Sequence, residues 1–406
     1  MTILLVSTIR RHIPYTEPSG FLYTIDLKQE RILRRCHIIE PAFREVDNNP
    51  RGGLRGSRGI ALHESQLALA NASAIYRYDP QWNLLGVITH PSCAAIHDII
   101  FQDNKLWVTS ARNDVLMQFD LNGNLLRHHY LRERTPALEA LDWKPRLLLR
   151  SEQIRQGKTD FRDPRTHDLE TFDAAHVNSV SILPNGDVLV SMGLVLTTKF
   201  ATLLKWKKKL IDMGLWSSLL AANRRVRDGL GLRKNVHSDL VLQPAKGRSA
   251  IVRIQPDGSQ SVCLTLSEIT VPSHSLLLLP DEKSVYLNTT AGEVVHFEPY
   301  TGEVLSSTKV TEGFLRGVKA LNKDTLILGS KGELLTFDIP TRRVLGTMRL
   351  SDDPNESVYD IQFLPEHYSL PPLSLEKHFE DLAGYKAEAM VRYGYQLQST
   401  DGIIAP

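Results

Sequence analysis

The chain has 406 residues, of which 42% are hydrophobic, 23% charged and 7% aromatic. This is the composition of a globular protein, and it excludes an intrinsically disordered chain. Lys and Arg number 48 against 46 Asp and Glu, so the net charge of +2 gives no global field that would favour a nucleic acid. The three cysteines, Cys36, Cys93 and Cys263, are too few and too scattered for a disulfide framework or a cysteine-based zinc site.

The N-terminal segment predicts a strand. Its apolar run, Ile-Leu-Leu-Val at 3–6, reaches Arg10 and Arg11 too soon for a signal peptide or a membrane span. Together with the low cysteine content, this predicts a cytoplasmic protein in a reducing compartment.

A phrase in which a polar residue precedes alternating apolar residues recurs along the chain. Its six copies are Arg58–Leu62, His97–Phe101, Asn178–Ile182, His274–Leu278, Arg316–Ala320 and Tyr359–Phe363. Most copies are followed by further short strands joined by turns such as Asn122-Gly123 and Thr301-Gly302. A period of about 40 residues with this punctuation predicts the four-stranded blades of a β-propeller.

Two intervals between copies are about twice the period, and they predict insertions at 131–175 and 194–247. Both insertions have the pattern of helix or irregular chain and lack strand alternation, which favours six blades over seven. The sixth copy is followed by a helix-like tail, whereas residues 3–33 offer three strands without a first one. We therefore expect an all-β, six-bladed propeller over 1–366, closed by pairing of the two chain ends, with a helical tail over 367–406 packed on it.

In its blade rhythm the chain resembles the six-bladed propeller group that includes gluconolactonases, paraoxonases, strictosidine-synthase-like proteins, streptogramin lyases and NHL-repeat proteins. The resemblance covers most of the chain and is one of architecture. The calcium cage usual in that group is not reproduced at the blade starts, so the resemblance does not imply calcium lactonase chemistry. The chain is also similar to bacterial propeller families for which resemblance implies no activity.

The first residues of the six phrases share one register and should converge around the propeller axis. They are Arg58, His97, Asn178, His274, Arg316 and Tyr359. Each of them can donate or accept a hydrogen bond or ligate a metal, whereas the positions two residues later are all aliphatic. This contrast predicts a functional site, and the alternative is a structural network of polar groups and channel water.

Two kinds of chemistry follow from these residue types. His97 and His274, with His176 two residues before Asn178, are candidate ligands for a divalent metal ion, and Asp98 and Asp360 are candidate ligands or partners of the histidines. Arg58, Arg316 and Asn178 are candidate binding residues for a small anionic molecule, through the bidentate bonding of guanidinium groups. The alternative for both arginines is a salt bridge to Asp98, Asp360 or Glu356.

We therefore expect a small-molecule enzyme, a hydrolase or lyase, that acts on an anionic metabolite in a lidded pocket at the channel mouth. In a metal-assisted version the histidines hold the ion; in a metal-free version His97 or His274 is the general base and Tyr359 the acid or oxyanion donor. The alternative is a propeller scaffold or binding protein without catalytic activity.

The second insertion is strongly basic. Residues 199–234 contain ten Lys or Arg residues and two Asp residues, a local net charge of +8. Apolar residues such as Leu203, Trp206 and Leu210 recur at helical spacing, which predicts an amphipathic helix. Three roles are open for it: a lid over the channel mouth, a peripheral membrane contact, or a contact with a protein partner.

Overall fold

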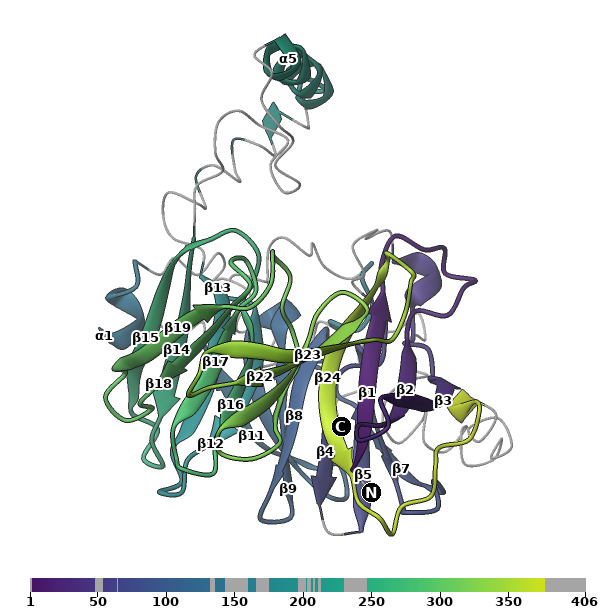
Figure 1. The fold of residues 1–406 in the computed structure, drawn as a ribbon. Helices are drawn as coiled ribbons and strands as arrows, with labels where there is room; N and C mark the ends of the chain where they lie inside the picture. The colour runs from purple at the N-terminus through teal and green to yellow at the C-terminus, as the bar shows by residue number, and fades with distance from the viewer. Residues whose placement is uncertain are drawn as a thin grey trace.

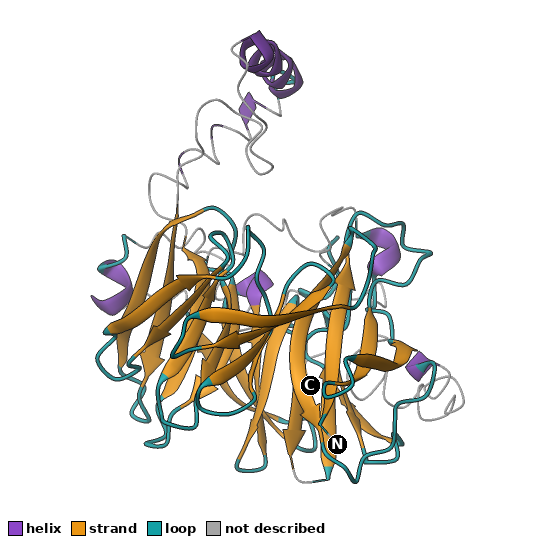
Figure 2. Ribbon diagram, viewed as in Figure 1, coloured by secondary structure: helices purple, strands orange, loops and turns teal. Residues whose placement is uncertain are grey.

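The computed structural model describes residues 2–47, 54–63, 65–131, 136–142, 160–165, 175–195 and 247–376, with 202, 206, 209–210 and 213–229 of the second insertion. Within these residues, six four-stranded antiparallel sheets stand side by side as the blades of a propeller (Figures 1 and 2). The first strands of successive blades contact one another around the whole ring. The prediction of an all-β, six-bladed propeller is therefore confirmed.

Five blades are built from consecutive strands, and the predicted phrases supply their inner strands. From inner to outer, the strands are β4 (Ile60–His63), β5 (Gln66–Ala70), β6 (Ile75–Tyr78) and β7 (Leu84–Ile88); β8 (Ile96–Gln102), β9 (Lys105–Ser110), β10 (Val115–Asp120) and β11 (Leu125–Tyr130); β12 (Val177–Ile182), β13 (Val188–Val195), β14 (Gly247–Ile254) and β15 (Gln260–Ile269); β16 (His274–Leu278), β17 (Ser284–Asn288), β18 (Glu293–Phe297) and β19 (Val304–Lys309); and β20 (Val318–Ala320), β21 (Thr325–Gly329), β22 (Glu333–Asp338) and β23 (Arg343–Arg349).

The sixth blade joins the two ends of the chain. Its inner strand β24 (Glu356–Leu364) pairs with β1 (Ile3–Arg10), and β2 (Phe21–Asp26) and β3 (Arg31–His37) complete it. Val6 lies opposite Ile361, as the predicted closure requires. The pairing includes a buried polar contact, because the Thr8 hydroxyl donates to Oε1 of Glu356 at 2.6 Å. Closure gives the sixth blade four strands, the same number as the other five blades.

The apolar core is divided among the interfaces between blades. Six clusters of buried side chains each lie between two neighbouring blades; Leu5 and Leu69, for example, belong to one of them. Each inner strand is therefore covered on both faces, whereas the outer strands are largely exposed, as in β23.

Hydrogen bonds also join neighbouring blades at the residue that follows four of the six candidate site positions. The carboxylate of Asp98 accepts the Val180 amide at 3.0 Å, and that of Asp360 accepts the Ile60 amide at 2.7 Å. The Ser179 hydroxyl accepts the next blade's amide in the same way. The structure thus gives Asp98 and Asp360 a role in holding blades together, not the predicted contact with the histidines.

The second insertion interrupts one blade, between β13 and β14, instead of separating two blades. Four helical segments are described from end to end: η1 (Arg44–Val46), η2 (Ala111–Asn113), α1 (Pro136–Glu139) and α5 (Trp216–Gly229). The described residues 202, 206, 209–210 and 375–376 are also helical. In Figure 1, α5 stands away from the blades. Within the described residues, no helix has the length and apolar character needed to cross a membrane.

The described start of the predicted C-terminal helical tail is irregular chain as far as Ser374, and helix begins at Leu375 and Glu376. Residues 369–374 run as irregular chain along the closing blade, where the Leu373 carbonyl accepts the His37 amide at 2.8 Å. The indole of Trp82 donates to the Ser369 carbonyl at 2.7 Å. Residues 377–406, which hold most of the predicted tail, lie outside the described residues.

Candidate functional site

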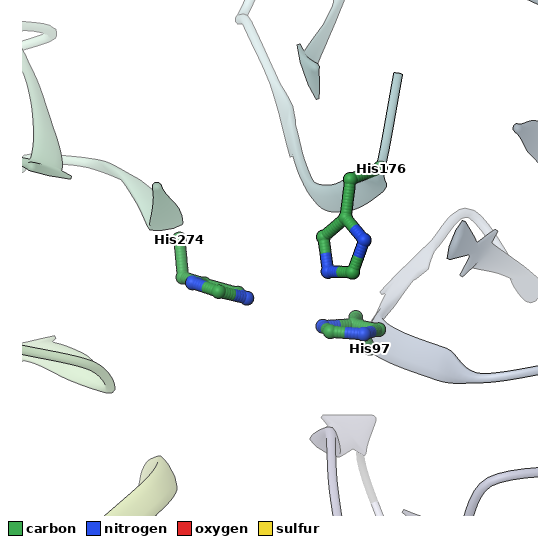
Figure 3. Close-up of side chains that lie close together, drawn as sticks. All are labelled: His97, His176 and His274. Carbon is green, nitrogen blue, oxygen red and sulfur yellow. The ribbon is translucent and has the colours of Figure 1, made fainter. Parts of the chain in front are cut away.

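Three histidines meet where three inner strands begin, and we call this end of the propeller the site mouth. His97 is the second residue of β8, His274 is the first of β16, and His176 directly precedes β12. One nitrogen from each ring lies within 4.8 Å of the others. The rings of His97 and His274 stack at 5.3 Å, and His176 points toward the gap between them (Figure 3). His97 and His274 are buried, whereas His176 is partly exposed and links the pair to the surface.

The backbone of His176 is strained and firmly held. Its φ of 53° lies in the left-handed region, which costs a non-glycine residue roughly 1–3 kcal/mol. The carboxylate of Asp114 accepts the His176 amide at 2.9 Å, and the His176 carbonyl accepts the Gly193 amide at 3.1 Å. This conformation turns the imidazole toward the other two rings.

Two buried arginines and a tyrosine border the histidines. The Arg316 guanidinium donates to Nδ1 of His97 at 2.6 Å and lies 3.4 Å from the ring centre of Tyr359. Arg58 donates to the Tyr359 hydroxyl at 3.2 Å and to the Ile96 carbonyl at 3.0 Å. The tertiary structure thus brings together Arg58, His97, His274, Arg316 and Tyr359, five of the six predicted positions.

Asn178, the sixth position, serves as a link between blades. Its amide nitrogen donates to the Ser273 carbonyl at 2.6 Å, directly before His274. A Cβ atom at Gly193 would lie 2.3 Å from this nitrogen, so the link requires a glycine there. Within the described part of the chain, Oδ1 of Asn178 is buried without a hydrogen-bond partner.

The hydrogen bonds place the ring protons of His97 and His274 on opposite nitrogens. The Thr289 hydroxyl gives its single proton to the Leu315 carbonyl at 2.9 Å, so it must accept from Nδ1 of His274 at 3.3 Å. Nε2 of His274 therefore carries a lone pair, and it has no partner among the described residues. A guanidinium can only donate, so in His97 the lone pair is on Nδ1 and the proton on Nε2.

Burial keeps both of these imidazoles neutral. Burial, reinforced by the charge of Arg316, lowers the pKa of His97 and of His274 well below the ordinary value. Burial also lowers the pKa of Arg316 to about 9. Arg316 makes no salt bridge with a carboxylate in the part of the chain that the structure describes, so its charge is available to an anion.

The three histidines fit a metal site by position but not by protonation. His274 has the arrangement of a ligand, with one nitrogen donating to a hydroxyl and the other free. His97 does not, because the bond from Arg316 leaves a proton on the nitrogen that would have to bind the metal. The nearby guanidinium charges oppose a divalent cation as well.

Sequence reasoning missed three residues that shape the site. Thr289 sets the tautomer of His274, Asp114 holds the backbone of His176, and the charge of Arg11 lowers the pKa of His274. Arg11 directly follows β1, the strand that pairs with β24. The predicted closure could therefore have indicated that Arg11 lies near the site. Thr289 and Asp114 lie in connections between strands, where no pattern marks them.

Comparison with known proteins shows the fold. No protein-family model matches the chain, and no curated protein sequence matches it. Among solved structures, it resembles one in a nidogen/laminin complex, with a TM-score of 0.50 and 7% identity, over 89% of this chain and 97% of that one. It also resembles a protein of unknown function from Bacteroides caccae, with a TM-score of 0.51 and 9% identity, over 90% and 99% of the two chains.

The chain is a six-bladed β-propeller. A virginiamycin B lyase from Staphylococcus aureus also aligns, with a TM-score of 0.40 and 10% identity, over 73% of this chain and 71% of that one. The predicted six-bladed architecture is confirmed by the six four-stranded sheets themselves. Function depends on the site and not on the fold, so any activity has to come from the residues at the site mouth.

Proposed function

We propose that this propeller is an enzyme that performs acid–base chemistry on a small anion at the site mouth. The observation that carries the proposal is the opposite protonation of two stacked, buried imidazoles, His97 and His274. Acid–base catalysis needs one group that takes a proton and another that gives one. Buried groups whose pKa is strongly shifted by burial and by a neighbouring charge, as at both of these histidines, are typical of functional sites.

The hydrogen bonds suggest a role for each side chain. Nε2 of His274 takes a proton from the substrate or from water, and Nε2 of His97 gives its proton to the leaving group. Arg316 and Arg58 hold the anionic group of the substrate. Tyr359 accepts from Arg58 and keeps its own hydroxyl proton to donate to a developing oxyanion.

These roles account for the proton transfers of both predicted reaction classes, lyase and hydrolase. In a lyase reaction, the proton of a C–H bond moves to His274, the electron pair forms the new double bond, and the leaving group departs with the proton of His97. In a hydrolase reaction, His274 takes the proton from water, which attacks as His97 protonates the leaving atom. In both reactions His97 is left as an imidazolate beside the Arg316 cation and regains its proton from His274, so that both rings are neutral again. A cytoplasmic location belongs to the proposal and is supported by three cysteines that are all free.

A binding and turnover experiment tests the proposal. Phosphate and a series of small carboxylates are titrated by calorimetry into the wild type and the Arg316→Gln and Arg58→Gln variants, and the ligands that bind are then assayed for turnover. We expect anion binding to fall at least about tenfold in both variants. His274→Gln should keep binding and lose turnover. Anion binding that does not depend on either arginine contradicts the proposal.

Two other outcomes separate the alternatives. Binding without turnover of any bound ligand would favour the non-enzymatic binding protein. One equivalent of metal in protein purified without an affinity tag, lost on His97→Ala and His274→Ala, would favour the metal-assisted version.

A further inference from the structure

The basic insertion leaves the propeller at the site mouth. Met192, near the end of β13, lies opposite Val177 at the start of β12. The next residue, Gly193, donates its amide to the carbonyl of His176 at 3.1 Å. The strand ends at Val195, and the chain returns to the same end of the blade at Gly247. The insertion therefore leaves and re-enters the propeller close to His176, at the site mouth.

The described residues of the insertion carry large apolar side chains that the propeller does not cover. These are Trp206, Met213, Leu215, Leu219 and Val226, which are between 43% and 58% exposed. Leu219 and Val226 are seven residues apart on α5 and share one helix face. The helix stands away from the blades in Figure 1. The described residues thus give no support to a lid and leave an apolar face without an intramolecular partner.

Positive charge is interleaved with these apolar side chains. The ammonium of Lys209 lies 5.6 Å from the ring centre of Trp206, and Arg225 is exposed on α5. Residues 199–234 hold a net charge of +8, whereas the whole chain has +2. In the sequence, the charge is therefore concentrated in the same segment as the exposed apolar residues.

Basic and apolar side chains mixed along one exposed segment fit a plane of anionic lipid headgroups. Such a surface takes the apolar side chains below the headgroups and pairs the cations with lipid phosphates and carboxylates. Here basic residues stand directly beside Trp206, at 205 and 207–209, and beside Val226, at 224, 225 and 227. Cations at both ends of a segment with exposed apolar side chains complement anionic lipid headgroups, which favours the membrane.

We infer that the described part of the insertion docks on an anionic membrane through its exposed apolar side chains, Trp206, Met213, Leu215, Leu219 and Val226, and turns the site mouth toward the bilayer. Docking uses no residue of the proposed acid–base site. The test of docking is therefore independent of the test of the proposed function.

Vesicle sedimentation of the full chain tests the inference. The protein is mixed with phosphatidylcholine vesicles that contain either no anionic lipid or about 30% phosphatidylserine. We expect binding only to the anionic vesicles, and at least about tenfold weaker binding when salt is raised from about 0.05 M to about 0.5 M. A blue shift of tryptophan emission that is reduced in Trp206→Phe would place this ring at the membrane.

Matched substitutions show whether vesicle binding depends on the insertion or on charged and apolar side chains anywhere on the surface. The pair Lys209→Glu and Arg225→Glu should weaken binding at least about tenfold, whereas the pair Lys323→Glu and Lys331→Glu, on exposed turns of another blade, should not. Leu219→Ser should weaken binding, and Leu345→Ser, which is 62% exposed on β23, should leave it unchanged. His97→Gln should bind vesicles like the wild type.

Three results would overturn the inference. One is no sedimentation with anionic vesicles at low salt, which would leave a protein partner as the role of this face. Another is equal loss of binding in the two charge-reversed pairs. The third is binding to vesicles without anionic lipid that salt does not change.

Discussion

The Arg316 guanidinium donates a hydrogen bond of 2.6 Å to Nδ1 of His97, although 219 residues separate the two in the sequence. This bond fixes the lone pair of His97 on one side of its ring and the proton on the other. At the stacked His274, the hydroxyl of Thr289 fixes the opposite arrangement. Three different blades thus cooperate to give two neighbouring imidazoles opposite roles.

The first prediction concerns these tautomers. In protein labelled with ¹⁵N-histidine, long-range proton–nitrogen spectra should show His97 protonated on Nε2 and His274 on Nδ1. Both rings should stay neutral at about pH 6.5, where an ordinary histidine is half protonated, because burial lowers their pKa. Arg316→Met should release the tautomer of His97 and leave that of His274 unchanged. Observation of an imidazolium at either position near neutral pH would contradict the assignment.

A second prediction concerns stability at acid pH. Because the folded-state pKa of His97 and of His274 is lowered, the unfolded chain binds protons at these sites first as the pH falls. Stability should therefore be highest above about pH 6.5 and decline below it, by up to about 1.4 kcal/mol per pH unit for each histidine. Urea unfolding across this range should show a shallower decline in the His97→Gln, His274→Gln double variant. An equal slope in both proteins would contradict the prediction.

The third prediction tests whether the hydroxyl group of Thr289, and not the size of its side chain, sets the tautomer of His274. Thr289→Val keeps the shape but leaves Nδ1 of His274 and the Leu315 carbonyl without their partner, at a cost of roughly 1–3 kcal/mol. Thr289→Ser retains the hydroxyl and should restore both the unfolding free energy and the tautomer of His274. If valine and serine behave alike, the hydroxyl does not set the tautomer.

A fourth prediction uses the buried carboxyl group of Asp98. Burial, followed by the charge of Asp360, raises its pKa well above the ordinary value, so its protonated form stabilises the fold and this contribution is lost as the pH rises. Asn is neutral at every pH and can still accept the Val180 amide. Asp98→Asn should therefore melt at a higher temperature than the wild type at about pH 8, and the difference should shrink toward about pH 5. A lower melting temperature at the higher pH would reverse the assigned sign.

The last prediction concerns the close approach of blades at Gly193. A methyl group there would meet Nδ2 of Asn178 at 2.3 Å and the Ser273 carbonyl at 2.6 Å. Gly193→Ala should cost roughly 1–3 kcal/mol of unfolding free energy, because the blades must move apart. Gly346→Ala is the matched control, since a Cβ on that outer strand meets nothing within 4 Å. Similar unfolding midpoints for the two variants would show that the link at Asn178 is dispensable.

Much of the fold could be predicted from the sequence because propeller blades are local units. Each of the six recurrent phrases is an inner strand, and the strand missing from the N-terminal part was found at Tyr359–Phe363, where β24 closes the ring. Strand alternation and turn residues act over a few neighbours, so they are visible in a single sequence. The C-terminal tail was harder, since the chain at 369–374 is held by bonds to His37 and Trp82, far away in sequence.

For the site, the residues that converge could be predicted from a single sequence, whereas the chemistry of each depends on its contacts in the folded chain. Shared register was enough to bring Arg58, His97, His274, Arg316 and Tyr359 to one end of the ring. Register does not show that Asn178 bonds to the next blade while His176 takes its place beside the imidazoles. Nor does it show which nitrogen holds a proton, because that depends on distances of about 3 Å between groups from different blades. Such distances follow from how whole blades pack.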